Sequence, residues 1–118
     1  MNSEKSKSPL RNKSYAFAIK IVKLSQNLVS ERREFVLSKQ VLRSGTAIGA
    51  LIRESEFAAS KPDFINKLTV LKEANETEYW LMLLHDTAYL PDNQFSQLKS
   101  ECNELIAMLG SSIKTSKK

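Results

Sequence analysis

Apolar residues along this chain recur at intervals of three and four positions, the spacing that gathers side chains on one face of an α-helix. Alternation of apolar and polar residues, which is typical of β-strands, is absent, and so are the Gly, Asn and Asp pairs of tight turns. The pattern therefore predicts an all-α protein. We expect four helices, at about residues 15–29, 38–59, 62–87 and 92–113.

Polar residues that can satisfy free backbone N–H groups stand where these helices should begin. Asn12 or Ser14 is expected to cap the first helix and Ser38 the second. Ser60 or Lys61 precedes Pro62 at the start of the third helix, where a proline N–H is not missed.

Two glycines lie one turn apart inside the second predicted helix, at Gly45 and Gly49. A glycine in a helix interior costs roughly 1 kcal/mol relative to alanine, so two of them need a local reason. Close approach of another backbone, which a missing Cβ allows, is the simplest one. We therefore expect the other helices to pack against these two glycines.

The first predicted helix carries two apolar faces instead of the single stripe of a surface helix. One face comprises Tyr15, Ala18, Ile19, Val22 and Val29, and the other comprises Phe17, Ile21, Leu24 and Leu28. Either this helix is buried on both sides within one domain, or its second face contacts another subunit.

Short connections between four amphipathic helices favour an antiparallel up-and-down four-helix bundle. The third helix is apolar over a wide arc, whereas the fourth shows a single stripe opposite its glutamates. We expect a disordered basic segment at residues 1–12, the bundle at 13–113 and a disordered basic tail at 114–118.

The net charge of +5 is unevenly spread over the 118 residues. Residues 1–43 hold ten basic and three acidic side chains, whereas residues 44–109 hold five basic and ten acidic ones. Such asymmetry indicates a polyanionic partner, although a solvated basic face would give the same composition. The candidate nucleic-acid-binding residues are Arg11, Lys13, Lys20, Lys23, Arg32, Arg33 and Arg43.

Composition also bears on the compartment. No apolar run is long enough for a membrane span, and the first residues lack the apolar core of a secretory signal. The single cysteine, Cys102, excludes an internal disulfide and is compatible with a reducing compartment. We therefore expect a cytoplasmic protein.

Four stretches carry a resemblance to a known family. They are K-S-Y-A-F-A-I-K-I-V-K-L (13–24), L-R-S-G-T-A-I-G-A-L-I-R-E (42–54), S-K-P-D-F-I-N-K-L (60–68) and L-K-E-A-N-E-T-E-Y-W-L (71–81). They resemble the bacterial four-helix-bundle proteins related to those encoded in 23S ribosomal RNA intervening sequences. The match runs from Lys13 to Lys117 in the expected order.

This resemblance implies an up-and-down bundle that assembles as a homopentameric ring. One branch of the family, the accessory proteins of diversity-generating retroelements, binds nucleic acid through basic surfaces. The chain departs from its relatives at Leu51, where they read Asn, and over residues 67–74, which are one residue shorter. A one-residue change rotates all that follows on a helix by about 100°.

Catalytic and metal-binding patterns are absent from the sequence. His85 is the only histidine and reads as a partly exposed helix residue, with a general base as the alternative. Cys102 lies on the apolar stripe of the fourth helix and reads as a core residue. No Glu-x-x-His pair and no phosphate-binding glycine loop is present, so we expect no enzyme, no metal and no cofactor.

Arg53 and Glu78 lie in the two stretches that match the family best, on the second and third helices. We expect them to form a structural ion pair that holds the two helices in register. A ligand contact by Arg53 is the alternative.

Two functions remain open at this point. The first is a non-catalytic oligomer that binds RNA or DNA, accessory to RNA processing or reverse transcription. The second is a protein-interaction scaffold in which the basic charge is incidental. The expected partners are other copies of the chain, RNA or DNA, and a partner protein.

Overall fold

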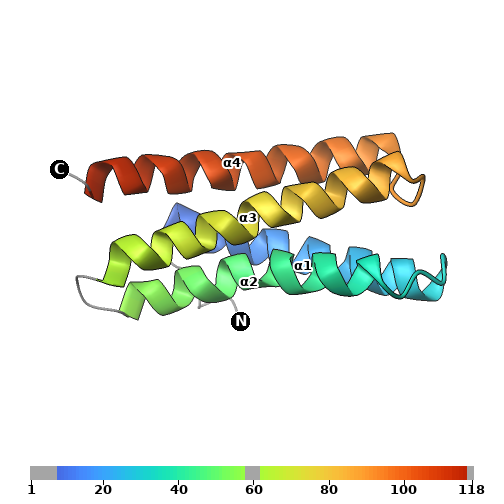
Figure 1. The fold of residues 1–118 in the computed structure, drawn as a ribbon, viewed down its shortest axis with the longest axis horizontal. Helices are drawn as coiled ribbons and strands as arrows, with labels where there is room; N and C mark the ends of the chain where they lie inside the picture. Colours follow the sequence, from blue (N-terminus) through green and yellow to red (C-terminus); the bar gives the residue numbers. More distant parts are fainter. Residues whose placement is uncertain (1–7, 58–61, 117–118) are drawn as a thin grey trace.

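A computed structural model of the chain describes residues 8–57 and 62–116. Four helices follow one another: α1 (Pro9–Ser30), α2 (Leu37–Phe57), α3 (Pro62–Asp86) and α4 (Asp92–Ser116). They run up and down in turn, with the α1–α2 and α3–α4 connections at the same end (Figure 1). The described ranges contain no strand. The predicted all-α four-helix bundle is thus confirmed.

The first helix begins earlier than the sequence pattern predicted. Ser8 caps α1 by accepting a hydrogen bond from the Arg11 N–H at 3.2 Å, and Pro9 occupies the first turn. A serine followed by proline meets both requirements of a helix start, so Asn12 and Ser14 are not needed as caps. Residues 9–12 are therefore helical, and α4 likewise runs beyond residue 113 to Ser116.

The second helix starts on a carboxylate. Glu34 is almost fully buried, and its side-chain oxygens accept hydrogen bonds from the N–H groups of Val36, Leu37 and Ser38 at 3.2, 2.9 and 2.7 Å. An anion at this position also opposes the helix dipole. The prediction that Ser38 caps this helix is wrong, because Ser38 lies within its first turn. The predicted helix end at Ala59, and the caps Ser60 and Lys61, fall outside the described residues.

All four helices contribute to one apolar core. Its buried side chains are Phe17, Ile21, Leu24, Leu28, Val41, Ile48, Ile52, Val70, Ala74, Leu81, Leu84, Leu90, Leu98, Cys102, Leu105 and Leu109. Burying each large aliphatic or aromatic side chain contributes about 1.5–3 kcal/mol, which makes this cluster the main source of stability. None of the helices, over the described residues, is both long and apolar enough to cross a membrane.

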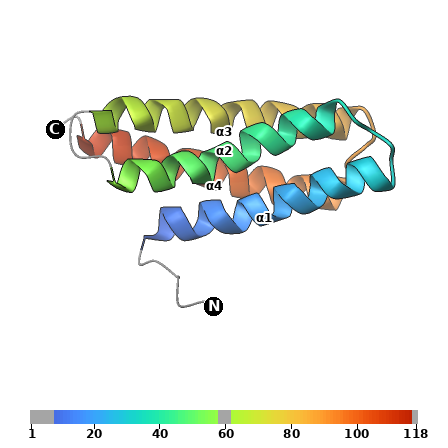
Figure 2. The ribbon, with the colours of Figure 1, turned by 90° about the horizontal axis from the view of Figure 1, so that it is seen from below.

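The second apolar face of α1 is only partly covered by this chain, with Ala18 and Val22 half-buried and the other three residues exposed. Tyr15, Ile19 and Val29 are 64%, 43% and 38% exposed, whereas the opposite row from Phe17 to Leu28 is buried. The helices form two facing pairs, and the outer side of α1 lies at the edge of the bundle (Figure 2). Burial on both sides within one domain is therefore excluded for these residues.

Both glycines of α2 face α1. A Cβ atom added to Gly45 would come within 2.8 Å of a side-chain carbon of Ile21, which is closer than real Cβ contacts. A Cβ atom added to Gly49 would lie 3.4 Å from the carbonyl oxygen of Ser14, an ordinary contact distance. The missing side chain at Gly45 therefore makes room for Ile21. At Gly49 there is enough space between α2 and the α1 backbone for a methyl group.

A buried polar layer sets the register between α2 and α3. The hydroxyl of Thr77 donates to the hydroxyl of Ser44 at 2.9 Å and also lies 2.8 Å from the backbone carbonyl of Glu73. Buried hydroxyl groups need such partners, so Ser44 is held opposite Thr77.

We predict opposite effects of alanine at the two glycines. Gly45→Ala should lower the free energy of unfolding by roughly 1–2 kcal/mol, because the clash with Ile21 outweighs the gain in helix propensity. Gly49→Ala should be neutral or stabilising by up to about 1 kcal/mol. Urea denaturation of the two variants measures both changes. A larger loss at Gly49 than at Gly45 would contradict the packing described.

Candidate functional site

Two of the four predicted nucleic-acid-binding residues of α1 pair with glutamates of α4, and Lys23 is exposed with no ion pair among the described residues. Lys13 pairs with Glu104 at 3.1 Å, and Lys20 pairs with Glu101. Both pairs are substantially exposed, so they contribute little stability, but each carboxylate neutralises the charge of its lysine. Arg11 lies half-buried in the first turn of α1. The continuous basic stripe expected along this helix is thus interrupted.

Arg43 is engaged in the same way, across α2 and α3. Its guanidinium contacts Glu73 at 3.2 Å and also contacts Glu76. Glu76 in addition accepts a hydrogen bond from the indole N–H of Trp80 at 3.0 Å. Arg43 therefore cross-links two helices, and its charge is balanced by two carboxylates.

The expected ion pair between Arg53 and Glu78 does not form. Glu78 lies 3.9 Å from Lys99 of α4, and Arg53 has no ion pair within the described ranges. The reason is the antiparallel register: Ser44 lies opposite Thr77, and Arg53 is nine residues further along α2. Nine residues of helix span about 13 Å, so Arg53 lies far beyond the level of Glu78.

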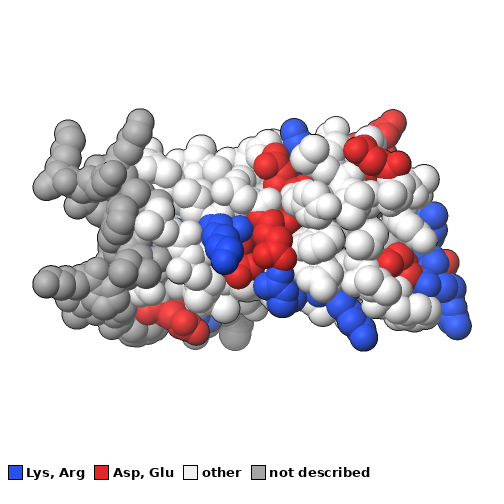
Figure 3. Space-filling model, viewed as in Figure 1, with Lys and Arg blue, Asp and Glu red and all other residues white. Residues whose placement is uncertain are grey.

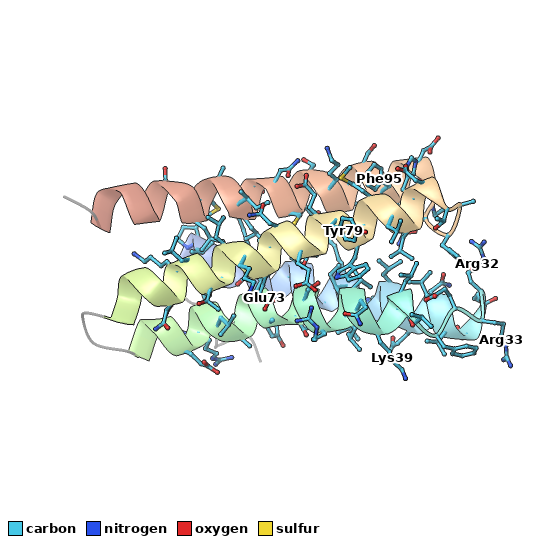
Figure 4. All side chains as sticks on the ribbon, in the orientation of Figure 1. Arg32, Arg33, Lys39, Glu73, Tyr79 and Phe95 are labelled. Carbon is cyan, nitrogen blue, oxygen red and sulfur yellow. The ribbon has the colours of Figure 1, made fainter. Side chains whose placement is uncertain are left out.

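Three basic side chains without a carboxylate partner lie at one end of the bundle, and Lys23, Arg53 and Lys72 elsewhere on the helices also form no ion pair within the described residues. Arg33 follows α1 and Lys39 lies in the first turn of α2, and neither forms an ion pair in the part of the chain that the structure describes. Blue side chains accumulate at this end of the molecule in Figure 3. Figure 4 shows Arg32, Arg33 and Lys39 at this same end. We call Arg32, Arg33 and Lys39 the basic end.

Arg32 ties the two connections of this end together. Its guanidinium donates to the backbone carbonyls of Ala88 and Tyr89 at 3.1 and 3.2 Å and lies 4.9 Å from the centre of the Tyr89 ring. These contacts satisfy carbonyls without neutralising the charge, because a carbonyl oxygen carries no net charge. Arg32 therefore fixes the connection and still contributes a positive charge.

Glu31 is exposed beside Arg32, whereas three other acidic residues nearby are held by other groups. The carboxylate of Glu34 is occupied by three N–H groups of α2. Asp86 and Asp92 lie 3.0 and 2.7 Å from the two ring nitrogens of His85, which stacks on Phe95 with ring centroids 4.2 Å apart. Hydrogen bonds to Asp92 and then Asp86 raise the pKa of His85 above its ordinary value.

Cys102 is a core residue. It is fully buried, and its thiol donates to the Ala74 carbonyl at 3.3 Å. Burial, together with the charge of Glu78, raises the pKa of the thiol to about 12. The thiolate is the reactive form, so this cysteine is chemically inert in the native fold. Among the described residues, no three side chains of the types His, Cys, Asp and Glu are grouped to hold a metal ion.

One feature of this end was missed at the level of sequence. Phe35 and Val36 are 47% and 69% exposed on the α1–α2 connection, separated from Arg32 and Arg33 by Glu34. An apolar pair so close to two arginines, outside the helical pattern, was the available signal.

We predict that Arg43 and not Arg53 supports the fold. Arg43→Met should lower the free energy of unfolding by about 0.5–1 kcal/mol, because it leaves two carboxylates of α3 without their partner. Arg53→Met should change it by less than about 0.5 kcal/mol. Chemical denaturation compares them. A loss at Arg53 equal to that at Arg43 would indicate that Arg53 has a partner after all.

We also predict a pH-dependent contribution from His85. Since its pKa is raised in the folded state, protonated His85 stabilises the fold fully below the unfolded pKa of about 6.5. This contribution is lost as the pH rises through the folded pKa. The thermal midpoint of His85→Gln should therefore fall below that of the parent protein at acidic pH and by less at alkaline pH. Asp92→Asn should lower the pKa of His85 in an NMR titration, and an unchanged pKa would refute the assigned cause.

Comparison with known proteins places this geometry in a family. A model described as 23S rRNA-intervening sequence protein matches residues 7–111. A solved structure from Bacteroides thetaiotaomicron, described as a protein with unknown function from the S23 ribosomal protein family, shares 49% identity and a TM-score of 0.87. The match covers 89% of this chain and 98% of that one. Among curated proteins, none matches. The resemblance seen in the sequence is confirmed, and the chain belongs to the 23S rRNA-intervening sequence protein family.

Proposed function

We propose that this protein is a non-catalytic nucleic-acid-binding module that contacts the phosphate backbone of RNA or DNA through the basic end. The observation that carries the proposal is the difference between paired and unpaired cations. Lys13, Lys20 and Arg43 face carboxylates, whereas Arg33 and Lys39 do not within the described residues. Only cations without an internal partner can exchange their counterions for phosphates at little cost.

Backbone contact is favoured over sequence reading. Lysine and arginine side chains at a helix start and on a connection can reach phosphates, and contacts to phosphates carry no sequence information. The binding should therefore be sequence-tolerant and should weaken steeply with salt.

Self-association is the second element of the proposal. Tyr15, Ile19 and Val29 on α1 and Tyr79 and Met82 on α3 expose apolar surface that another copy would cover. The family resemblance suggests a ring of five. Five copies would raise the net charge from +5 to about +25, which gives a stronger field for a polyanion.

Such a module could act as an accessory subunit of an RNA-processing or reverse-transcribing enzyme. It would bind the nucleic acid, and the enzyme would carry out the reaction. The competing candidate is a protein-interaction scaffold. The same apolar surface favours it, in particular Leu68, Tyr79 and Met82 on α3, if a different protein covers that face.

We predict that charge reversal weakens binding only at the basic end. Lys39→Glu should reduce the affinity for a generic oligonucleotide by about fivefold or more at roughly 50 mM salt. Lys72→Glu, an exposed lysine of α3, makes the same change in net charge and should have a much smaller effect. Fluorescence anisotropy measures both. Glutamate in the first turn of a helix favours the fold, so Lys39→Glu should remain folded.

Three outcomes separate the candidates. Affinity that is lost between about 50 and 200 mM salt, and that depends on Lys39 more than on Lys72, supports the proposal. Equal effects of the two variants would mean that only net charge matters and would refute the basic end as the site. Absence of binding at low salt would favour the scaffold.

A further inference from the structure

The α1–α2 connection exposes an aromatic ring that the fold does not use. Phe35 is 47% exposed and Val36 is 69% exposed, whereas Phe17, Leu24 and Leu28 of α1 are buried in the core. Exposed aromatic side chains on a short connection lose hydrophobic stabilisation. A ligand that covers the ring would recover it.

The backbone on both sides of this ring is fixed. The N–H of Glu34 donates to the carbonyl of Leu28 at 2.9 Å, and the carboxylate of Glu34 accepts from Val36 and Leu37. Arg32 is held by the carbonyls of Ala88 and Tyr89. Phe35 therefore sits on a preorganised segment, which reduces the entropy lost when a ligand binds.

Arg33 stands beside the ring in a backbone conformation that costs free energy. Its φ angle is +56°, in the left-handed region that glycine adopts more easily. Its guanidinium carbon lies 5.6 Å from the centre of the Phe35 ring, within the range of a cation–π contact. Residue 33 is thus an arginine although glycine would adopt this backbone conformation at a lower cost in free energy. The arginine places a positive charge next to an exposed aromatic face.

We propose that Phe35 and Arg33 form a stacking site for an unpaired base of a single-stranded nucleic acid, with Arg33 and Lys39 contacting the phosphates on either side. This inference rests on the proposed function and narrows its substrate class. In a single strand the face of an unpaired base is accessible, and the base is joined through its sugar to flanking phosphates, which matches an aromatic face beside a cation. A duplex hides the faces of its bases, so it can use the cations but not the ring.

The surroundings favour a nucleic acid over a lipid surface. Only Phe35 and Val36 project apolar side chains from this connection, and Glu31 is exposed one turn away. Anchoring to a bilayer needs a larger apolar face or a run of basic residues that is free of acidic ones. One ring beside one guanidinium is sufficient for one base.

The test compares two nucleic acids on the full-length protein. An oligouridine of about 12 nucleotides and a duplex with the same number of phosphates are titrated by anisotropy at the same salt concentration. Phe35→Leu should weaken binding of the single strand by about tenfold and binding of the duplex by less than about twofold. Phe35→Tyr should retain both affinities. Val36→Ala, which shortens the exposed apolar side chain next to Phe35 and leaves the ring in place, should change neither.

Arg33→Gly gives a second, independent readout. Because glycine relieves the left-handed backbone, the thermal midpoint should rise by roughly 2–4 °C while the affinity for both nucleic acids falls. Ala88→Gly is the matched control: Ala88 also has a positive φ, of 69°, and this change relieves it without removing a charge. Its midpoint should rise too, with affinity unchanged.

The outcomes separate this proposal from the broader one. If Phe35→Leu weakens both nucleic acids equally or neither, while Lys39→Glu still weakens both, the stacking site is refuted and the backbone-binding function stands. If the parent protein binds neither, the broader function fails. A change in oligomeric state for Phe35→Leu by light scattering, or tighter Phe35-dependent binding to phosphatidylserine vesicles than to oligouridine, would assign the ring to self-association or to a membrane and overturn the proposal.

Discussion

The contact between α1 and α2 at Gly45 is the constraint from which the rest of the bundle follows. Ile21 occupies the space that any side chain at this position would need. With α1 at this distance, Phe17, Leu24 and Leu28 reach the common core, and the hydroxyl of Ser25 can donate to the carbonyl of Ser38 at 3.1 Å. If the first helix were displaced outward, both the apolar row and this buried hydrogen bond would be lost together.

The charged residues follow this packing and do not direct it. Once the helices are in place, α1 lies beside α4 and α2 beside α3, and lysines and arginines meet glutamates across both seams. These pairs are partly exposed and individually weak. Their main effect is on the distribution of charge: they neutralise Lys13, Lys20 and Arg43 on the sides of the bundle, whereas the cations of the basic end keep their charge.

The sequence pattern predicted the helices and the rows that face the core, because burial of a helix face depends on spacing within a few residues. Gly45 could be recognised for the same reason. The ion-pair partners of Lys20 and Arg43, and the failure of Arg53 to meet Glu78, could not be predicted, since an ion pair between helices depends on their relative register, which the pattern does not contain. Glu34 was missed as a cap because its role arises only when the connection folds back on the start of α2. The positive φ at Arg33 is likewise a property of that turn.

The burial of Cys102 has a practical consequence for work on this molecule in solution. It is the only cysteine of the chain, and its thiol is enclosed in the centre of the bundle. A cysteine introduced at an exposed position would therefore be the one site that reacts with a maleimide fluorophore or a spin label. Distances and motions at either end of the bundle can be followed in this way without first replacing a core side chain.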